Sequence, residues 1–171
     1  MNVQSPHNQQ SGRYIIERAT ERDLDRILQI EQESFSAPWT RKMFEVELNE
    51  NPFGHLYTAR AATESLKPEI AAGYVCFWVV FEELRLMTLA VDCSARRRGV
   101  GTELLRYALV CGRFEGASRA LLEVRESNAA ALRLYEQAGF CRTAVREQYY
   151  TNPREDAILM EKDLLVGANG E

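Results

Sequence analysis

The spacing of apolar residues along the chain alternates between a helical and a strand pattern. Leu24, Ile27, Leu28 and Ile30 recur at helical intervals and predict an amphipathic helix. Thr20 is expected to cap this helix. A break at 37–40 separates it from a second helix, which is predicted from Thr40 to Asn51-Pro52.

Two more helices and a series of strands follow. One helix after Gly101 is expected to end near Gly112 or Gly116, and Ser127 is expected to cap another that stops at Ala138-Gly139. Strands are predicted at 13–18, 55–61, 69–81, 84–91, 120–125, 140–149 and 157–164. The pattern therefore indicates one mixed α/β domain, although it does not give the order of strands in the sheet.

The predicted strands include two pairs that lie close enough in sequence to form hairpins. Turns are expected at Glu82-Glu83 and at Asn152-Pro153. The longest apolar run, Tyr74 to Phe81, has eight residues, whereas a membrane span needs about 20. This run is therefore expected to be a core strand.

The composition is that of an ordinary globular protein, with 171 residues of which 46% are hydrophobic and 27% charged. We expect one domain over 13–164, a disordered polar leader at 1–12 and a flexible tail at 165–171. The net charge of −4 gives no basic footprint, so direct nucleic-acid binding is not expected. Without a hydrophobic signal core, the expected location is the cytoplasm.

Histidine and cysteine usage narrows the chemistry further. Of two histidines, His7 lies in the leader and only His55 remains, which argues against a histidine-based zinc site or a Ser-His-Asp triad. No metal is expected. Four cysteines without a CxxC pair are interpreted as small buried residues.

The segment 86–105 suggests a phosphate-bearing ligand. An apolar strand ending at Val91 is followed by three arginines at 96–98, by Gly99-Val100-Gly101, and at once by a helical pattern. Guanidinium groups, close backbone approach and a helix N-terminus together suit a diphosphate. The Walker tripeptide is absent, and Leu104 stands where a dinucleotide fingerprint needs glycine. A structural turn and a solvated charge run remain alternatives.

The segment 121–140 contains a candidate base and a candidate acid. Strand alternation puts Glu123 on the face opposite Leu122 and Val124, and a carboxylate in an apolar strand is costly to bury without a partner. Tyr135 shares a helix face with Asn128. Glu123 and Tyr135 can converge on one cleft and supply acid–base chemistry without histidine. The alternatives are an exposed Glu123 paired with an arginine such as Arg125, and a core tyrosine.

Four segments resemble the GNAT acetyltransferases and, within them, the bacterial ribosomal-protein-alanine N-acetyltransferases. The Arg-x-x-Gly-x-Gly motif at 96–101 is similar to the superfamily's acyl-CoA pyrophosphate signature. The closer resemblance is carried by 37–48, 89–101, 122–140 and 149–160, and it spans 13–164. It implies an α/β fold with a mostly antiparallel mixed sheet, flanked by helices and splayed between its fourth and fifth strands. Acetyl-CoA is expected in the split.

The same resemblance assigns residues to the acetyl donor. The backbone at Leu89, Ala90 and Val91 is expected to pair with the pantetheine arm, and Asn128 to contact the donor. The pyrophosphate is expected to be held by Arg96, Arg97, Arg98, Gly99, Val100, Gly101 and Thr102.

The reaction that the resemblance implies is direct attack of a protein N-terminal amine on the thioester, and the expected acceptor is the N-terminal alanine of a small-subunit ribosomal protein. Glu123 corresponds to the family's general base, acting through a water, and Tyr135 to its general acid. Strand N–H groups are expected to stabilise the oxyanion. The acceptor is expected to contact Trp39, Tyr149, Tyr150 and Asp156, all of which also have structural explanations: a core plug, sheet-edge cover and turn capping.

Three alternatives stay open at this point. The first is a broader N-terminal, lysine or small-amine acetyltransferase. The second is a non-catalytic acyl-CoA-binding module that uses the same loop. The third is a nucleotide-binding protein whose arginine–glycine segment holds another diphosphate, against which the missing lysine signature argues.

Overall fold

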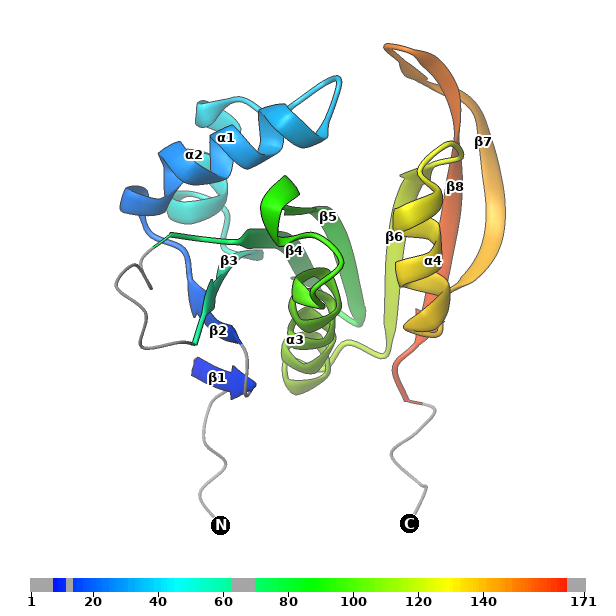
Figure 1. Ribbon diagram of the computed structural model, residues 1–171. Coiled ribbons are helices and arrows are strands. Elements are labelled where there is room, and N and C mark those ends of the chain that lie inside the picture. The colour runs from blue at the N-terminus through cyan, green and yellow to red at the C-terminus, as the bar shows by residue number, and fades with distance from the viewer. Residues whose placement is uncertain (1–7, 12–13, 63–69, 166–171) are drawn as a thin grey trace.

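The computed structural model describes residues 8–11, 14–62 and 70–165, which form one mixed sheet with helices on both faces (Figure 1). The strand order is β1-β2-β3-β4-β5-β6-β8-β7. The strands are β1 (Asn8–Ser11), β2 (Tyr14–Arg18), β3 (Gly54–Ala61), β4 (Gly73–Val80), β5 (Glu83–Val91), β6 (Arg119–Arg125), β7 (Cys141–Thr151) and β8 (Arg154–Asp163).

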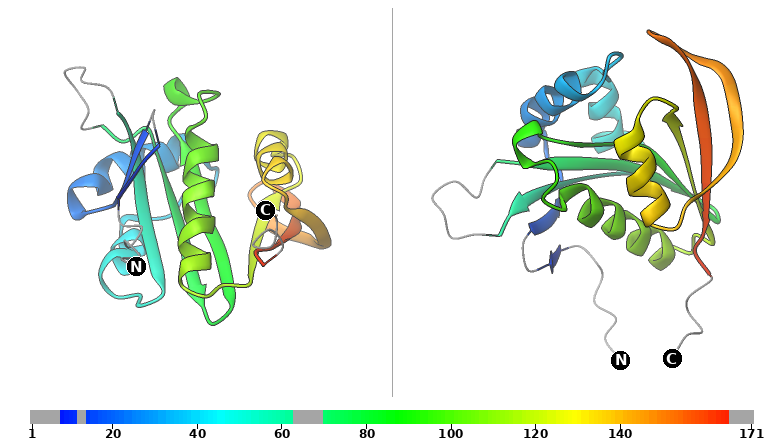
Figure 2. Two further views of the ribbon diagram at one scale, coloured as in Figure 1. Left: turned by 90° about the horizontal axis from the view of Figure 1, so that it is seen from below. Right: turned by 45° about the vertical axis from the view of Figure 1, so that its right-hand side comes forward.

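The helices cover the two faces because the strands alternate their apolar side chains. Val75 and Phe77 on β4 pack with α3, whereas Tyr74 and Cys76 pack with α1 and α2. The views in Figure 2 show α3 lying along the sheet. The helices are α1 (Leu24–Ser34), α2 (Arg41–Asn49), α3 (Val100–Phe114) and α4 (Ala129–Gln137), with short 3-10 turns η1 (Glu21–Asp23) and η2 (Cys93–Ala95).

The sheet splits between β5 and β6, the one parallel pair among the described strands. Their pairing joins Glu83–Leu86 to Arg119–Leu122 and goes no further. β5 continues to Val91 and β6 to Arg125 without pairing to each other, and the two halves diverge in Figure 1. The predicted splay is confirmed, since β5 and β6 are the fourth and fifth strands counted from β2.

Several predicted boundaries need correction. The β4–β5 turn lies at Phe81-Glu82, not at Glu82-Glu83, because Phe81 takes the left-handed φ of 52° that the tight turn needs. β4 begins at Gly73, and the expected strand start at Glu69 falls outside the described residues. α3 starts at Val100, just before Gly101.

The cap of α4 is Asn128, so the prediction of Ser127 was wrong. The Asn128 side chain accepts the Ala131 N–H at 3.1 Å. Ser127 stands one residue too early, and its own N–H donates to Glu155. Asparagine and serine cap helices about equally well, so their order alone could not distinguish them.

Two composition-based expectations also differ from the structure. Residues 8–11, placed in the disordered leader, pair antiparallel with β2 as the edge strand β1. Cys76 and Cys111 are buried as expected, but Cys93 and Cys141 are exposed. No helix in the described part of the chain is long and apolar enough to cross a membrane.

Candidate active site

Three adjoining cavities follow the split between β5 and β6. The loop-side hollow is lined by residues 34–35, 89–91, 96–97, 99–102, 128, 130–131, 133–135 and 137. The central pocket is lined by residues 31, 35–37, 39, 86–89, 122–125, 128, 131, 135 and 150. The hairpin-side hollow is lined by residues 39, 85–87, 121–123, 146, 149–150 and 159–161. Because each outer hollow shares lining residues with the central pocket, two ligands can approach one centre from different sides.

The loop-side hollow presents the N-terminus of α3. Gly99 caps the helix with a left-handed φ of 87°, which a residue with a side chain rarely adopts. Since Glu103 N–H is the first to bond back into the helix, at 3.0 Å to Gly99, the N–H groups of Val100, Gly101 and Thr102 are left to a ligand. These backbone donors and the helix dipole suit an anion.

Two of the three neighbouring arginines contribute to the same hollow. Arg96 and Arg97 line it, and Arg96 is fixed by donating to the Val91 carbonyl at 3.0 Å. Arg98 does not line it; its side chain is exposed, and its carbonyl accepts from the Tyr14 hydroxyl at 3.4 Å. The arginines are therefore not equivalent, which their run in the sequence could not show.

The β5 backbone faces the split at alternate residues. Asp92 N–H bonds to Ala72 at 2.9 Å on the β4 side, so alternation turns the N–H and C=O groups of Val91 and Leu89 the other way. Ala90 faces β4, and the Val91 carbonyl is taken by Arg96. Of the three predicted strand residues, Leu89 best presents unused backbone groups to a ligand.

The loop between β5 and α3 is tied to α1 by Asp92. Its carboxylate accepts Ser94 N–H at 2.9 Å and pairs with Arg26, and Arg26 also donates to the Ala71 carbonyl at 3.1 Å. Hydrogen bonds from Ser94, followed by the contact with Arg26, lower the pKa of Asp92. The loop between β5 and α3 is thus fixed to α1 by a charged network.

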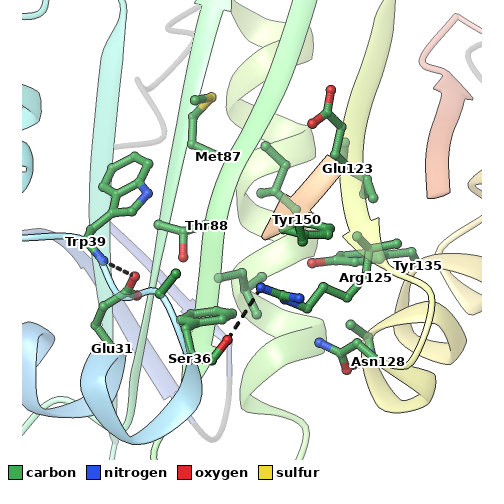
Figure 3. A pocket seen from close by; sticks show the side chains of 17 residues that line it. Glu31, Ser36, Trp39, Met87, Thr88, Glu123, Arg125, Asn128, Tyr135 and Tyr150 are labelled. Atoms are coloured by element: carbon green, nitrogen blue, oxygen red, sulfur yellow. Dashed lines mark hydrogen bonds between the residues drawn. The ribbon is translucent and has the colours of Figure 1, made fainter. Parts of the chain in front are cut away.

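The central pocket brings together Asn128 and Tyr135 from α4 (Figure 3). Because the Asn128 oxygen is used in capping, its amide N–H groups remain for the pocket. Tyr135 is 7% exposed, and its ring packs edge-on against Phe140 at 5.9 Å. Burial, with a smaller effect of Tyr150, raises the pKa of Tyr135, so the phenol is protonated at neutral pH as a proton donor must be.

Glu123 lies between the central pocket and the hairpin-side hollow. Its carboxylate pairs with Arg146 at 2.9 Å, and its side chain is 33% exposed. The predicted alternative of a pair with an arginine is therefore realised, but with Arg146 on β7 and not with Arg125. The Glu123 charge in turn raises the pKa of the neighbouring Tyr149.

Sequence reasoning considered Arg125 solely as a partner for Glu123, whereas it bridges the two halves of the split. Its guanidinium pairs with Glu155 at 3.2 Å, donates to the Asn152 carbonyl at 2.9 Å and reaches Ser36 on the α1–α2 loop at 3.4 Å. It also lies over the Tyr150 ring, 4.1 Å from its centre. Ser36 closes the bridge by donating to Asn152 at 2.7 Å.

The predicted acceptor residues divide into two groups. Trp39, Tyr149 and Tyr150 line the hairpin-side hollow, and Trp39 also packs on Phe44 at 5.3 Å. Asp156 lines none of the three cavities; its carboxylate accepts the Gln148 N–H at 2.8 Å, within the irregular part of β7. The structural alternative for Asp156 is thus supported by a contact.

Sequence reasoning missed Glu31, which lines the central pocket at 1% exposure. Its carboxylate accepts the Trp39 N–H at 2.8 Å and the Tyr74 hydroxyl. Burial raises the pKa of Glu31. A signal was present, because Glu31 stands four residues after Ile27 on the apolar stripe of its helix, where a charge is unusual.

The sequence is similar to a known protein family and to several of its members. The model of the Acetyltransferase (GNAT) family matches residues 24–140. A Bacillus subtilis protein named as a putative ribosomal protein bS18-alanine N-acetyltransferase is 35% identical over 138 residues, covering 81% of this chain and 87% of the relative. The Escherichia coli protein named as the ribosomal protein bS18-alanine N-acetyltransferase is 36% identical over 140 residues, covering 81% and 89%.

A solved structure agrees over nearly the whole chain. The crystal structure of the ribosomal-protein-S18-alanine N-acetyltransferase from Escherichia coli superposes with a TM-score of 0.76 at 32% identity. The match covers 92% of this chain and 99% of that one.

Proposed function

The chain belongs to the GNAT family of acetyltransferases, and on that premise we propose that it moves an acetyl group from acetyl-CoA to the N-terminal α-amine of a protein. The observation that carries the proposal is the pair of hollows on either side of the central pocket. One offers backbone donors and arginines, and the other offers aromatic rings and a carboxylate. A phosphate-bearing donor and a peptide acceptor fit these two chemistries.

The donor occupies the loop-side hollow in this proposal. Its diphosphate accepts hydrogen bonds from the N–H groups of Val100, Gly101 and Thr102, with Arg96 and Arg97 beside it. The backbone of Leu89 pairs with the amide-bearing arm, in the place that a further strand would take. Asn128 directs its amide N–H groups at the same arm.

Glu123 and Tyr135 share the proton transfers. Glu123, through a water, takes a proton from the α-ammonium, so that the free amine can attack the thioester carbonyl. The C–N bond forms, the C–S bond breaks, and Tyr135 gives its proton to the departing sulfur. Of the two protons that the nitrogen loses, one leaves to solvent through Glu123 and the other restores the phenol of Tyr135, so each turnover releases one proton to solvent.

The acceptor in this proposal is the N-terminal alanine of a small-subunit ribosomal protein. Support comes from the two relatives named as bS18-alanine N-acetyltransferases, each of which this chain matches over more than four-fifths of that relative's length. Trp39, Tyr149 and Tyr150 form the apolar surroundings of the first acceptor residues. A small alanine side chain suits a pocket bounded by three aromatic rings. A cytoplasmic location goes with a ribosomal acceptor.

The test is acetylation of matched peptides with acetyl-CoA, followed by mass-spectrometric mapping of the modified atom. One peptide begins with alanine and carries an internal lysine, a second has its α-amine blocked, and a third begins with a bulky residue. The proposal predicts modification of the first peptide at its α-amine alone. Acetylation of the lysine in the blocked peptide at a similar rate would contradict it.

A further inference from the structure

Glu31 is a buried carboxylate in the wall of the central pocket, and the proposed chemistry does not use it. It lies in the last turn of α1 and is 1% exposed. Thr88 on β5 stands beside it, and both line the pocket on the wall opposite Asn128 and Tyr135 (Figure 3). Glu31 therefore brings a carboxylate to the pocket in which the proposed acetyl transfer takes place.

The partners of Glu31 are all neutral. The carboxylate accepts the Trp39 N–H at 2.8 Å and the Tyr74 hydroxyl, and that hydroxyl in turn lies 3.3 Å from the Thr88 hydroxyl. Among the described residues no lysine or arginine forms a salt bridge with it, whereas Glu123 on the other wall is paired with Arg146 at 2.9 Å. A buried carboxylate without a cation is costly. A cationic ligand bound beside this carboxylate would supply the missing counter-charge.

We propose that Glu31 binds the α-ammonium group of the acceptor before that group loses its proton. This inference rests on the proposed function. The two carboxylates then have different roles. Glu31 attracts and orients the charged amine. Glu123, which Arg146 already neutralises in part, accepts the proton. A charge-assisted hydrogen bond of this kind is short, directional and stronger than a neutral one.

A second buried glutamate shows why position matters. Glu47 is 6% exposed and also has neutral donors, accepting from Trp78 Nε1 at 2.8 Å and from Asn51 at 2.8 Å. Neutral donors can therefore satisfy a buried carboxylate by themselves. Glu47 lines none of the three cavities of the split, so it provides a matched control for a change of charge under burial.

The test compares two peptides that differ in one charge. Both have the same sequence, but one begins with alanine and the other with a propionyl group, which keeps the carbon skeleton and lacks the amine. Their dissociation constants are measured by calorimetry with the enzyme saturated with coenzyme A, so that no transfer occurs. The full-length protein is used as wild type, Glu31→Gln, Glu31→Asp and Glu47→Gln.

The inference predicts that wild type and Glu47→Gln bind the alanine peptide about tenfold more tightly than the propionyl peptide. In Glu31→Gln the ratio falls to near one, because the amide keeps an oxygen for Trp39 but loses the charge. Glu31→Asp keeps a preference for the amine even where both peptides bind more weakly. Because Glu31→Asp keeps the charge, it tests the inference even if the glutamine variant is unstable.

Two results would overturn the inference. One is a ratio near one in the wild type; the other is an unchanged ratio in Glu31→Gln with both peptides weakened equally, which would make Glu31 a support for the Trp39 loop. If the wild type fails to acetylate the same alanine peptide with acetyl-CoA, the proposed function fails. Acetylation together with either result above contradicts the role of Glu31 alone.

Discussion

The two sides of the split are built in different ways. On the loop side, many of the groups that face a ligand are close in sequence and largely backbone: the α3 N-terminus from Gly99 to Thr102 follows β5 after one short loop. On the hairpin side they are side chains from three separate segments: Trp39 on the α1–α2 loop, Glu123 on β6, and Arg146 and Tyr150 on β7, which meet only after folding. The first kind of site is specified locally, and the second depends on tertiary packing.

This difference predicts that substitutions on the two sides affect different kinetic constants. A change on the loop side should alter the affinity for acetyl-CoA. A change on the hairpin side should alter kcat/KM for the acceptor peptide. Changes at the centre should alter turnover. The following predictions test that division.

The largest effect is expected from Tyr135→Phe. Removing the phenolic proton should lower kcat by about 100-fold, because general acid catalysis contributes on that order, while acetyl-CoA affinity stays nearly intact. Steady-state kinetics and calorimetry measure the two quantities. Tyr107→Phe is the control and should leave kcat unchanged. Tyr107, on α3, is fully buried in the core and lines none of the three cavities. Unchanged turnover in Tyr135→Phe would remove the assignment of the acid.

Arg125→Lys should have the next largest effect, and it should act on the acceptor side. Lysine keeps the charge but loses the planar fork that reaches Ser36, Asn152 and Glu155 together. We expect kcat/KM for the peptide to fall about tenfold with the KM for acetyl-CoA unchanged, as expected for loss of about 1.4 kcal/mol.

The control for Arg125→Lys lies on the same strand. Arg119 pairs with Glu83 at the far end of β6, and Arg119→Lys should leave both constants as in the wild type. An equal loss of acetyl-CoA affinity in Arg125→Lys would show that the bridge supports both hollows.

Arg97→Ala and Arg98→Ala should separate two neighbouring arginines. Arg97 lines the loop-side hollow and Arg98 does not, so the KM for acetyl-CoA should rise about fivefold in the first variant and little in the second. The difference should shrink at high salt, because these are exposed charges. Equal effects would mean that the arginines act through general charge and not through position.

At Asn128, a cap and a ligand contact can be separated by two substitutions. Asn128→Ser keeps a helix cap and removes the amide donors, whereas Asn128→Ala loses both. We expect the serine variant to keep wild-type thermal stability and lose about threefold in acetyl-CoA affinity. The alanine variant should lose about 1 kcal/mol of unfolding free energy as well. Thermal melting and calorimetry check the two effects.

The smallest expected effect is on the stability of the fold in acid. One carboxylate on each side of the split contributes to it. Hydrogen bonds from Ser94 lower the pKa of Asp92, and those from Ser127 lower the pKa of Glu155. A lowered folded-state pKa gives stability that is present above the unfolded-state value and is lost as the pH falls below about 4. Asp92→Asn and Glu155→Gln should each flatten the acid decline in melting temperature between pH 7 and 3.

The loop side of the split could be predicted from the sequence in more detail than the hairpin side. The strand, the glycines and the start of α3 are local signals, so the β5–α3 junction was expected correctly from 86–105, and the splayed sheet from the family resemblance. The turn and cap corrections at Phe81 and Asn128 are shifts of one residue, which propensities cannot resolve. Residues 8–11 pair with β2 although their polar composition predicted disorder.

The hairpin side could not be predicted in the same detail. Ser36 and Asn152 are 116 positions apart, and Arg125 and Ser36 are 89 apart. No local pattern specifies such contacts, because they depend on how the β7–β8 hairpin and the α1–α2 loop are placed. In the central pocket, Glu31 could have been noticed as a charge on an apolar helical stripe, but its hydrogen-bond partners lie beyond its own helix, on β4 and on the α1–α2 loop.

The most direct test of the account is a crystal structure with coenzyme A linked through its sulfur to the α-amine of an alanine-first peptide. The account predicts the diphosphate at the N–H groups of Val100 to Thr102 and the peptide among Trp39, Tyr149 and Tyr150. The linkage should lie in the central pocket beside Tyr135. A peptide that leaves through the loop-side hollow, or a linkage far from Tyr135, would contradict it.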